Sequence, residues 1–130
     1  MIPMIGILII THGTLGEALV QCLGHVMNRR PPQLMQLGIS GQDDPLDVLP
    51  LARRLVELVD SGDGVLILTD ILGATPANTA AKLLEPGRIE GVTGVNVPML
   101  LRVITYRERS IEVLVKKAVA GACEGVVHMK

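Results

Sequence analysis

Two polar residues stand where apolar runs end, and together they could do chemistry. His12 follows one such run in "LIITHGTLGEAL", and Asp70 follows another in "VLILTDILG". A strand buried in a core does not need an imidazole at its end, so His12 can be a loop residue, a metal ligand or a nucleophile. If Asp70 accepts a hydrogen bond from one ring nitrogen, the other nitrogen keeps a free lone pair, which makes His12 a nucleophile.

The elements that would position these residues alternate along the chain. Short apolar, β-branched runs predict strands at residues 4–10, 34–39, 65–69 and 89–95, with a short final strand at 126–129. Helical spacing predicts helices at about residues 15–26, 45–60, 76–84, 98–106 and 111–122. We expect Asp44, Thr75 and Ser110 to be N-caps. Asn96 and Pro98 are interpreted as a turn and a helix start.

This alternation predicts an α/β fold in one domain over residues 1–130, with a doubly wound, mostly parallel open sheet and helices on both faces. In a sheet of order 2-1-3-4, ligands lie outside the carboxyl ends of the strands, where the strand order reverses. That place lies between the first and third strands. The residues just past these strands are 11–13 and 70–75, so His12 and Asp70 are expected to be neighbours.

An anion site is expected around this pair. The helices that begin after Gly13 and at Thr75 would point their unpaired N–H groups and positive dipole ends toward it. Gly13 and Gly73 allow a close approach of the backbone, and the hydroxyl of Thr75 could contact a phosphate. We therefore predict a phosphoryl-transfer site in which Thr11, Gly13, Gly73 and Thr75 bind the phosphate. "GTLG" lacks the lysine of a P-loop, which disfavours nucleoside triphosphate chemistry.

Metal binding is the alternative for His12. It would need further ligands, yet the chain has no HExxH motif, and neither His25 nor His128 stands at a ligand spacing from His12. We expect structural roles for those two histidines, no metal and no cofactor. Cys22 and Cys123 lie far apart without a CxxC motif and are expected to be free thiols.

The composition excludes other classes of protein. The 130 residues are 48% hydrophobic with one aromatic residue, Tyr106, and the net charge is −1. Basic residues are scattered apart from Arg102, Arg107 and Arg109, so a nucleic-acid partner is not expected. The longest apolar run, residues 5–10, is far below the ~18 residues of a membrane span and has no signal-peptide features. We expect a cytoplasmic protein that does not insert into a membrane.

Four segments resemble the IIA domain of the mannose family of the bacterial sugar phosphotransferase system, in order and spacing: "THGTLGEAL", "LTDILGATPANTAAKLL", "GVNVPMLLRV" and "EGVVHMK". The resemblance runs from about residue 4 to residue 130. It implies a phosphocarrier in which His12 accepts a phosphoryl group from phospho-HPr, at the ring nitrogen remote from the carboxylate, and passes it to a IIB component for sugar uptake. Asp70 would orient the ring, and Thr75 stands where the family often has Ser.

The resemblance also implies a homodimer that exchanges a C-terminal antiparallel edge strand, here residues 126–129. Such an exchange would cover a sheet edge that is otherwise exposed. Two other functions stay open: a regulatory IIA-like protein that binds partners according to its phosphorylation state, and the phosphodonor subunit of a dihydroxyacetone kinase. Leu72 and Ala74 depart from the residues frequent in the family, which affects the detail of the loop. The sequence names no sugar and no downstream partner.

Overall fold

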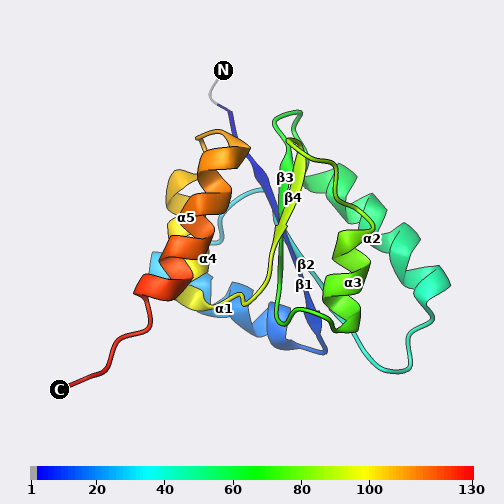
Figure 1. Ribbon diagram of the computed structural model, residues 1–130, viewed down its shortest axis with the longest axis horizontal. Helices are drawn as coiled ribbons and strands as arrows, with labels where there is room; N and C mark the ends of the chain where they lie inside the picture. Colours follow the sequence, from blue (N-terminus) through cyan, green and yellow to red (C-terminus); the bar gives the residue numbers. More distant parts are fainter. Residues whose placement is uncertain (1–2) are drawn as a thin grey trace.

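One sheet with helices on both faces forms the protein (Figure 1), and the computed structural model describes residues 3–130. The strands are β1 (Gly6–His12), β2 (Leu34–Ile39), β3 (Val65–Thr69) and β4 (Ile89–Val92). Their order is β2-β1-β3-β4, and every neighbouring pair is parallel. The predicted order 2-1-3-4 is confirmed, and the sheet is parallel throughout the described residues.

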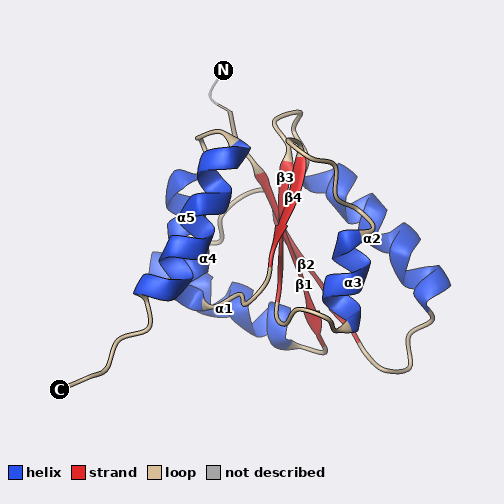
Figure 2. Ribbon diagram, in the orientation of Figure 1, coloured by secondary structure: helices blue, strands red, loops and turns tan. Residues whose placement is uncertain are grey.

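The helices form two layers. They are α1 (Leu15–Met27), α2 (Pro45–Val59), α3 (Thr75–Ala81), α4 (Val97–Tyr106) and α5 (Ile111–Glu124). Helices α1, α4 and α5 cover one face of the sheet, while α2 and α3 cover the other (Figure 2). Within residues 3–130, no helix is long and apolar enough to cross a membrane.

Strand β1 shows why the central strands read as continuous apolar runs. Ile7 and Ile9 pack into the core beneath α1, α4 and α5, whereas Leu8 and Ile10 pack into the core beneath α2 and α3. All four side chains are fully buried. A strand with helices on both sides needs apolar residues at every position, and this requirement fixes β1 in the centre of the sheet.

Most predicted helix starts are confirmed. The side chain of Asp44 accepts a hydrogen bond from the N–H of Leu46 at 2.9 Å, and Ser110 caps α5 through the N–H of Val113 at 3.3 Å. Asn96 is the N-cap of α4 and accepts from the N–H of Met99 at 2.8 Å. These oxygens each satisfy a backbone donor that the helix itself leaves unpaired.

The prediction that Thr75 is an N-cap is wrong. Ala74 is the N-cap of α3 and makes no side-chain cap bond, so Thr75 becomes the first helical residue and Pro76 the second. The helix begins one residue early because Gly73 takes a left-handed φ of 87°, and the extended backbone of Ala74 then enters the helix. Pro76 is tolerated because the N–H that it lacks would have no partner inside the helix.

Three predicted ends are also wrong. Strand β4 stops at Val92 instead of residue 95, because Gly94 has a left-handed φ of 80° that interrupts the extended backbone. Helix α3 stops at Ala81 instead of residue 84, and a turn follows it. Strand β1 runs to His12 instead of residue 10, so the histidine is itself the last residue of the strand.

Residues 126–129 form no strand in the isolated chain. The segment leaves α5 and extends away from the body of the protein (Figure 1). Val126, Val127 and Met129 are 78%, 72% and 89% exposed. Within the sheet of residues 3–130, strand β4 has β3 as its one neighbouring strand and therefore lies at an edge, where Ile89 also forms an isolated bridge with Glu85.

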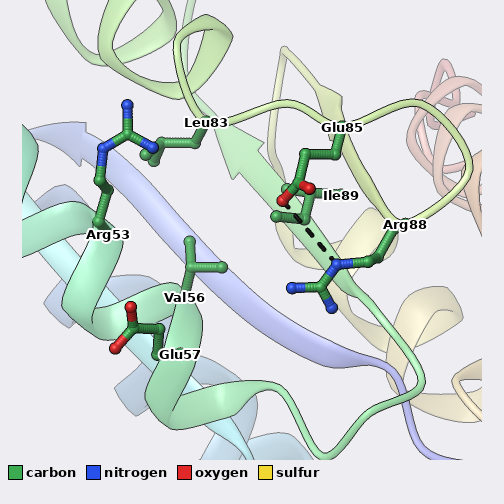
Figure 3. Close-up of a pocket in the computed structure, with 7 residues that line it drawn as sticks. All are labelled: Arg53, Val56, Glu57, Leu83, Glu85, Arg88 and Ile89. Atoms are coloured by element: carbon green, nitrogen blue, oxygen red, sulfur yellow. Dashed lines mark ion pairs between the residues drawn. The ribbon is translucent and has the colours of Figure 1, made fainter.

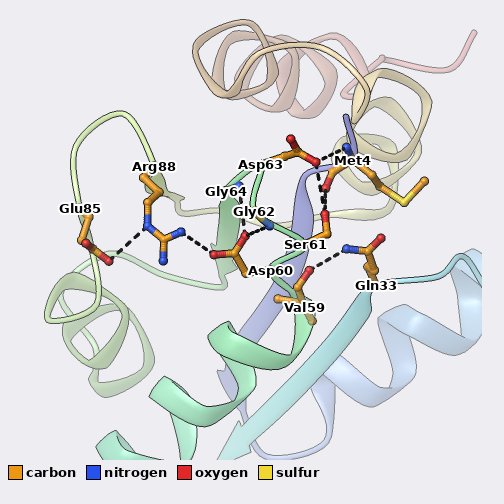
Figure 4. Close-up of polar contacts among 10 residues, drawn as sticks. All are labelled: Met4, Gln33, Val59, Asp60, Ser61, Gly62, Asp63, Gly64, Glu85 and Arg88. Atoms are coloured by element: carbon orange, nitrogen blue, oxygen red, sulfur yellow. Dashed lines mark hydrogen bonds and ion pairs between the residues drawn. The ribbon is translucent and has the colours of Figure 1, made fainter. Parts of the chain in front are cut away.

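Polar side chains tie the chain together at the amino end of the sheet. Asp60, the C-cap of α2, accepts hydrogen bonds from the N–H groups of Gly62 and Gly64 and from the guanidinium of Arg88 (Figure 4). Burial alone would raise the pKa of Asp60, but the hydrogen bonds from Gly62, Arg88 and Gly64 together hold that pKa below its usual value. The carboxylate thus fixes the turn that leads into β3.

Arg107 is a second polar tie at this end, and its side chain is only 3% exposed. Its Nε and Nη2 donate to the carbonyl oxygen of Ile5 at 3.0 and 2.8 Å. Nη1 donates to Pro32 at 2.6 Å, and Nη2 also donates to Gln33 at 2.8 Å. The guanidinium therefore joins the end of α4 to the segments that lead into β1 and β2. The sequence grouped Arg107 with Arg102 and Arg109 and missed this role.

Candidate functional site

His12 and Asp70 lie side by side at the carboxyl end of the sheet. His12 ends β1, and Asp70 follows the neighbouring strand β3, with Ile10 paired to Thr69 just before them. Nδ1 of His12 lies 2.6 Å from Oδ2 of Asp70, and the backbone N–H of His12 donates to the same oxygen at 2.9 Å. The topology therefore brings together the pair that the sequence predicted to be neighbours.

Hydrogen bonds fix the charge and the orientation of Asp70. Burial alone would raise the pKa of its carboxyl group, but the hydrogen bonds from the backbone and the ring of His12 lower that pKa below its usual value. The N–H of Ile71 donates to the other carboxylate oxygen, Oδ1, at 3.0 Å. The side chain is 13% exposed, so the carboxylate faces His12 and not the solvent.

This contact determines which tautomer the neutral imidazole ring of His12 adopts. A carboxylate can only accept hydrogen bonds, so Nδ1 of His12 must carry the proton that it shares with Asp70. In the neutral ring Nε2 then holds a lone pair. Within residues 3–130, Nε2 has no hydrogen-bond partner, and the His12 side chain is 54% exposed. The ring thus presents an unshared nitrogen lone pair to the solvent.

Thr11 and Gly13, on either side of His12, use their polar groups inside the fold. The side chain of Thr11 is fully buried, and its hydroxyl accepts a hydrogen bond from the N–H of Gly16 at 2.8 Å. The N–H of Gly13 donates to the carbonyl oxygen of Ile39 at 2.9 Å. The structure therefore commits the Thr11 hydroxyl and the Gly13 N–H to holding the turn between β1 and α1.

Gly38 supports the same turn and was missed in the sequence. It pairs with Thr11 across the β1–β2 ladder. A Cβ added to Gly38 would lie 1.9 Å from the carbonyl oxygen of Gly13, so only glycine leaves room for the chain to turn over β2. The available signal was a glycine inside a strand, which often marks the close approach of another backbone.

The loop between β3 and α3 forms the other side of the site. Gly73 turns the chain with its left-handed φ, and the hydroxyl of Thr75 is exposed, with no hydrogen-bond partner among residues 3–130. Ile71 and Leu72 are 58% and 80% exposed, and Leu15 at the start of α1 is 42% exposed. This loop and the start of α1 lie at the same end of the sheet (Figure 1). Apolar side chains therefore stand beside the exposed imidazole of His12.

The remaining candidates are not part of this arrangement. Among the described residues, no three His, Cys, Asp or Glu side chains gather as a metal ion would require. Cys22 and Cys123 are free and exposed, which confirms that prediction. Asn96, besides capping α4, donates through Nδ2 to the carbonyl oxygen of Ala122 at 3.4 Å. Asn96 therefore joins α4 to α5.

The fold and the site define a class of protein: a doubly wound α/β domain that presents an oriented, solvent-facing histidine at the carboxyl edge of its sheet. Comparison with known protein families then identifies the family to which the chain belongs. The model of the EIIA-man family, described as "PTS system fructose IIA component", matches residues 6–119. The chain therefore belongs to the mannose-type EIIA family of the phosphotransferase system (PTS).

Individual relatives agree with this assignment. The chain is 30% identical over 129 residues to the PTS system mannose-specific EIIAB component of Escherichia coli, covering 97% of this chain but 40% of that protein's length. It is 30% identical over 106 residues to the fructose-specific EIIA component of Bacillus subtilis, covering 81% of this chain and 72% of that protein. The crystal structure of a PTS component EIIA from Streptococcus agalactiae superposes with a TM-score of 0.85 at 25% identity, covering 96% of this chain and 97% of that one.

Family membership thus places the chain among the EIIA components of the phosphotransferase system.

Proposed function

We propose that this protein takes a phosphoryl group from phospho-HPr onto Nε2 of His12 and passes it to a IIB component for sugar uptake. The observation that carries the proposal is the 2.6 Å contact between Nδ1 of His12 and the carboxylate of Asp70. This contact fixes the ring so that the nitrogen remote from the carboxylate faces the solvent, where another protein can reach it.

In the proposed reaction the Nε2 lone pair of His12 attacks the phosphorus atom of the phosphohistidine donor. The bond from phosphorus to the new nitrogen forms as the bond to the donor nitrogen breaks, and the electron pair of the broken bond returns to the donor ring. Positive charge then develops on the His12 ring, where the charged Asp70 stabilises it through Nδ1–H. Positioning and charge stabilisation of this kind supply most of the catalysis in phosphoryl transfer.

The residues around the ring have two proposed roles toward the phosphoryl group. Thr75 offers a free hydroxyl, and Gly73 permits the backbone of the loop to come close. Thr11 and Gly13, proposed from the sequence to bind phosphate, act indirectly by holding the turn that carries His12. A small set of direct donors suits a carrier, which must also release the group to its next acceptor.

Protein partners must approach His12 closely, because the proposed transfer passes the phosphoryl group directly from one protein to the other. The exposed apolar side chains of Leu15, Ile71 and Leu72 lie on the two segments that border the site. Exposed apolar groups of this kind favour contact with another protein surface. We propose that HPr and the IIB component use this surface in turn.

We also propose a homodimer in which residues 126–129 of each copy pair with the free edge of β4 in the other. Two observations support it: three apolar side chains of this segment are exposed, and within the described sheet β4 has a neighbouring strand on one side only. Sedimentation velocity of the whole chain should give a dimer, and Val127→Asp should shift the protein toward the monomer. A monomer at all micromolar concentrations would contradict the exchange.

The phosphocarrier proposal is tested with radiolabelled phosphoenolpyruvate, enzyme I and HPr. The wild-type chain should gain acid-labile phosphate at one site, and His12→Ala should lose all of it. His25→Ala is the matched control, because His25 lies on α1 away from the site, and it should label normally. Labelling that persists in His12→Ala would overturn the proposal.

A further inference from the structure

Two arginines meet at the amino end of the sheet, opposite the His12 site. Arg107 is buried beside the segments that lead into β1 and β2, and Arg29 lies on the loop that follows α1. Burial, together with the positive charge of Arg29, lowers the pKa of Arg107 to about 10. The two positive charges are therefore close enough to repel each other.

No carboxylate among residues 3–130 forms an ion pair with either arginine. A guanidinium has five N–H donors, and Arg107 uses four of them on backbone carbonyl oxygens, so one N–H on Nη1 is left. The exposed Arg29 side chain makes no hydrogen bond within the described residues. Unused donors and uncompensated charge thus occur at the same place.

A different pocket in this protein shows arginine side chains whose positive charges are balanced by carboxylates. It lies between α2 and the turn before β4, has a volume of about 130 Å³, and is lined by Arg53, Glu57, Glu85 and Arg88 above apolar residues (Figure 3). There Arg88 pairs with Glu85 at 3.8 Å and also with Asp60. Positive and negative side chains alternate in that pocket, so it has no preference for an anion.

The pocket beside Arg29 and Arg107 has a volume of about 200 Å³. Met4, Pro31, Pro32 and Ile104 supply apolar walls, and Glu108 is the only acidic residue in its lining. Glu108 is exposed and forms no ion pair with either arginine in the described structure. The pocket therefore combines room for a small molecule with an excess of positive charge.

We propose that this pocket, at the opposite end of the sheet from His12, binds a phosphate group through the guanidinium groups of Arg29 and Arg107. A phosphate carries several acceptor oxygens, so it can accept from the remaining N–H of Arg107 and from the two parallel N–H groups of Arg29 at once. The group can belong to inorganic phosphate or to a small phosphate ester whose carbon part contacts the apolar walls.

The test is an NMR titration of the ¹⁵N-labelled whole chain with inorganic phosphate and, separately, with glycerol 3-phosphate, each at constant ionic strength set by chloride. The buried Nε–H of Arg107 and the amide of Gln33 should shift and saturate. Binding of inorganic phosphate alone assigns the site to free phosphate, and binding of both ligands assigns it to the phosphate group of an ester. Signals near His12 are followed separately, so phosphate bound there is not counted.

Three variants decide the outcome. Arg29→Met should weaken binding about tenfold or more, because a charge-assisted pair of hydrogen bonds is lost. Arg109→Met should leave binding unchanged, because Arg109 lies with Arg107 in the loop between α4 and α5 but outside the pocket. Glu108→Gln should tighten binding by roughly threefold, because it removes the one negative charge in the lining. Shifts that do not saturate, or that are equal in wild type and Arg29→Met, would show an adventitious ion only and overturn the proposal.

Discussion

The side chains of Asp60 and Arg107 at the amino end of the sheet differ from those of His12 and Thr75 at the carboxyl end in how their polar atoms are used. At the amino end, Asp60 and Arg107 are held by several hydrogen bonds to neighbouring backbone, and Arg107 is almost wholly buried. At the carboxyl end, His12 leaves Nε2 free, Thr75 leaves its hydroxyl free, and the hydroxyl of Thr69 is buried without a partner among residues 3–130.

This difference suggests that the amino end of the sheet contributes mainly to the stability of the fold and the carboxyl end mainly to the proposed phosphoryl transfer. The hydrogen bonds of Asp60 and Arg107 hold the chain in one conformation, whereas the exposed Nε2 of His12 and the exposed hydroxyl of Thr75, beside exposed apolar side chains, are free to act on a partner. Substitutions at the amino end should therefore change the free energy of unfolding with little effect on phosphoryl transfer. Substitution of His12 or Asp70 at the carboxyl end should do the reverse.

Arg107→Met should have the largest effect and should act on stability. It removes four hydrogen bonds and takes the Arg107 donors away from the carbonyl oxygens of Ile5, Pro32 and Gln33, which should lower the free energy of unfolding by about 3 kcal/mol. Urea unfolding measures this loss, with Arg109→Met as the control. The folded variant should transfer phosphate at the wild-type rate; a slowed transfer would show that the two ends are coupled.

Asp70→Asn should slow the proposed phosphoryl transfer and leave the fold intact. An asparagine amide can donate to Nδ1, which favours the tautomer with the proton on Nε2 and removes the lone pair that attacks phosphorus. We expect transfer from phospho-HPr to slow about 100-fold. Rapid-quench measurement of labelling gives the rate, and urea unfolding checks that the fold is kept. An unchanged rate would refute the orienting role of Asp70.

The order of the sheet and the contact between His12 and Asp70 could both be predicted from the sequence. Continuous apolar runs marked β1 and β3 as central strands, and parallel topology then placed His12 beside Asp70. Both inferences need only local patterns and one general rule about parallel sheets. They therefore required no knowledge of how individual side chains pack.

Features that depend on distant contacts could not be predicted in this way. The acceptors of Arg107 lie 74 to 102 residues away along the chain, so nothing near Arg107 distinguished it from a solvated arginine. The need for Gly38 follows from the path of Gly13 over β2, which depends on the register of two strands. Thr75 is not the N-cap of α3, because Gly73 turns the chain and α3 begins one residue earlier than expected.

Gly38→Ala should affect both properties, because Gly38 lies under the turn that carries His12. Its new Cβ would lie 1.9 Å from the carbonyl oxygen of Gly13, so the turn must move. We expect a loss of about 2 kcal/mol in the free energy of unfolding and a clear slowing of transfer. Gly41→Ala is the matched control, because a Cβ there meets no atom within 4 Å. Equal behaviour of the two variants would contradict the packing at Gly38.

Asp60→Asn should have the smallest effect on the free energy of unfolding, and that effect should depend on pH. The pKa of Asp60 is lower in the folded chain than its ordinary value of 3.8, so its carboxylate stabilises the fold above that pH and the stabilisation is lost as the pH falls through the folded pKa. The variant lacks this titration. Its free energy of unfolding should therefore be about 1 kcal/mol lower than wild type at pH 7, and the difference should shrink toward pH 3. Urea unfolding at both pH values measures the change, and a difference that stays constant would show that the Asp60 charge contributes nothing. Transfer at pH 7 should be unchanged, because the residue lies at the end of the sheet away from His12.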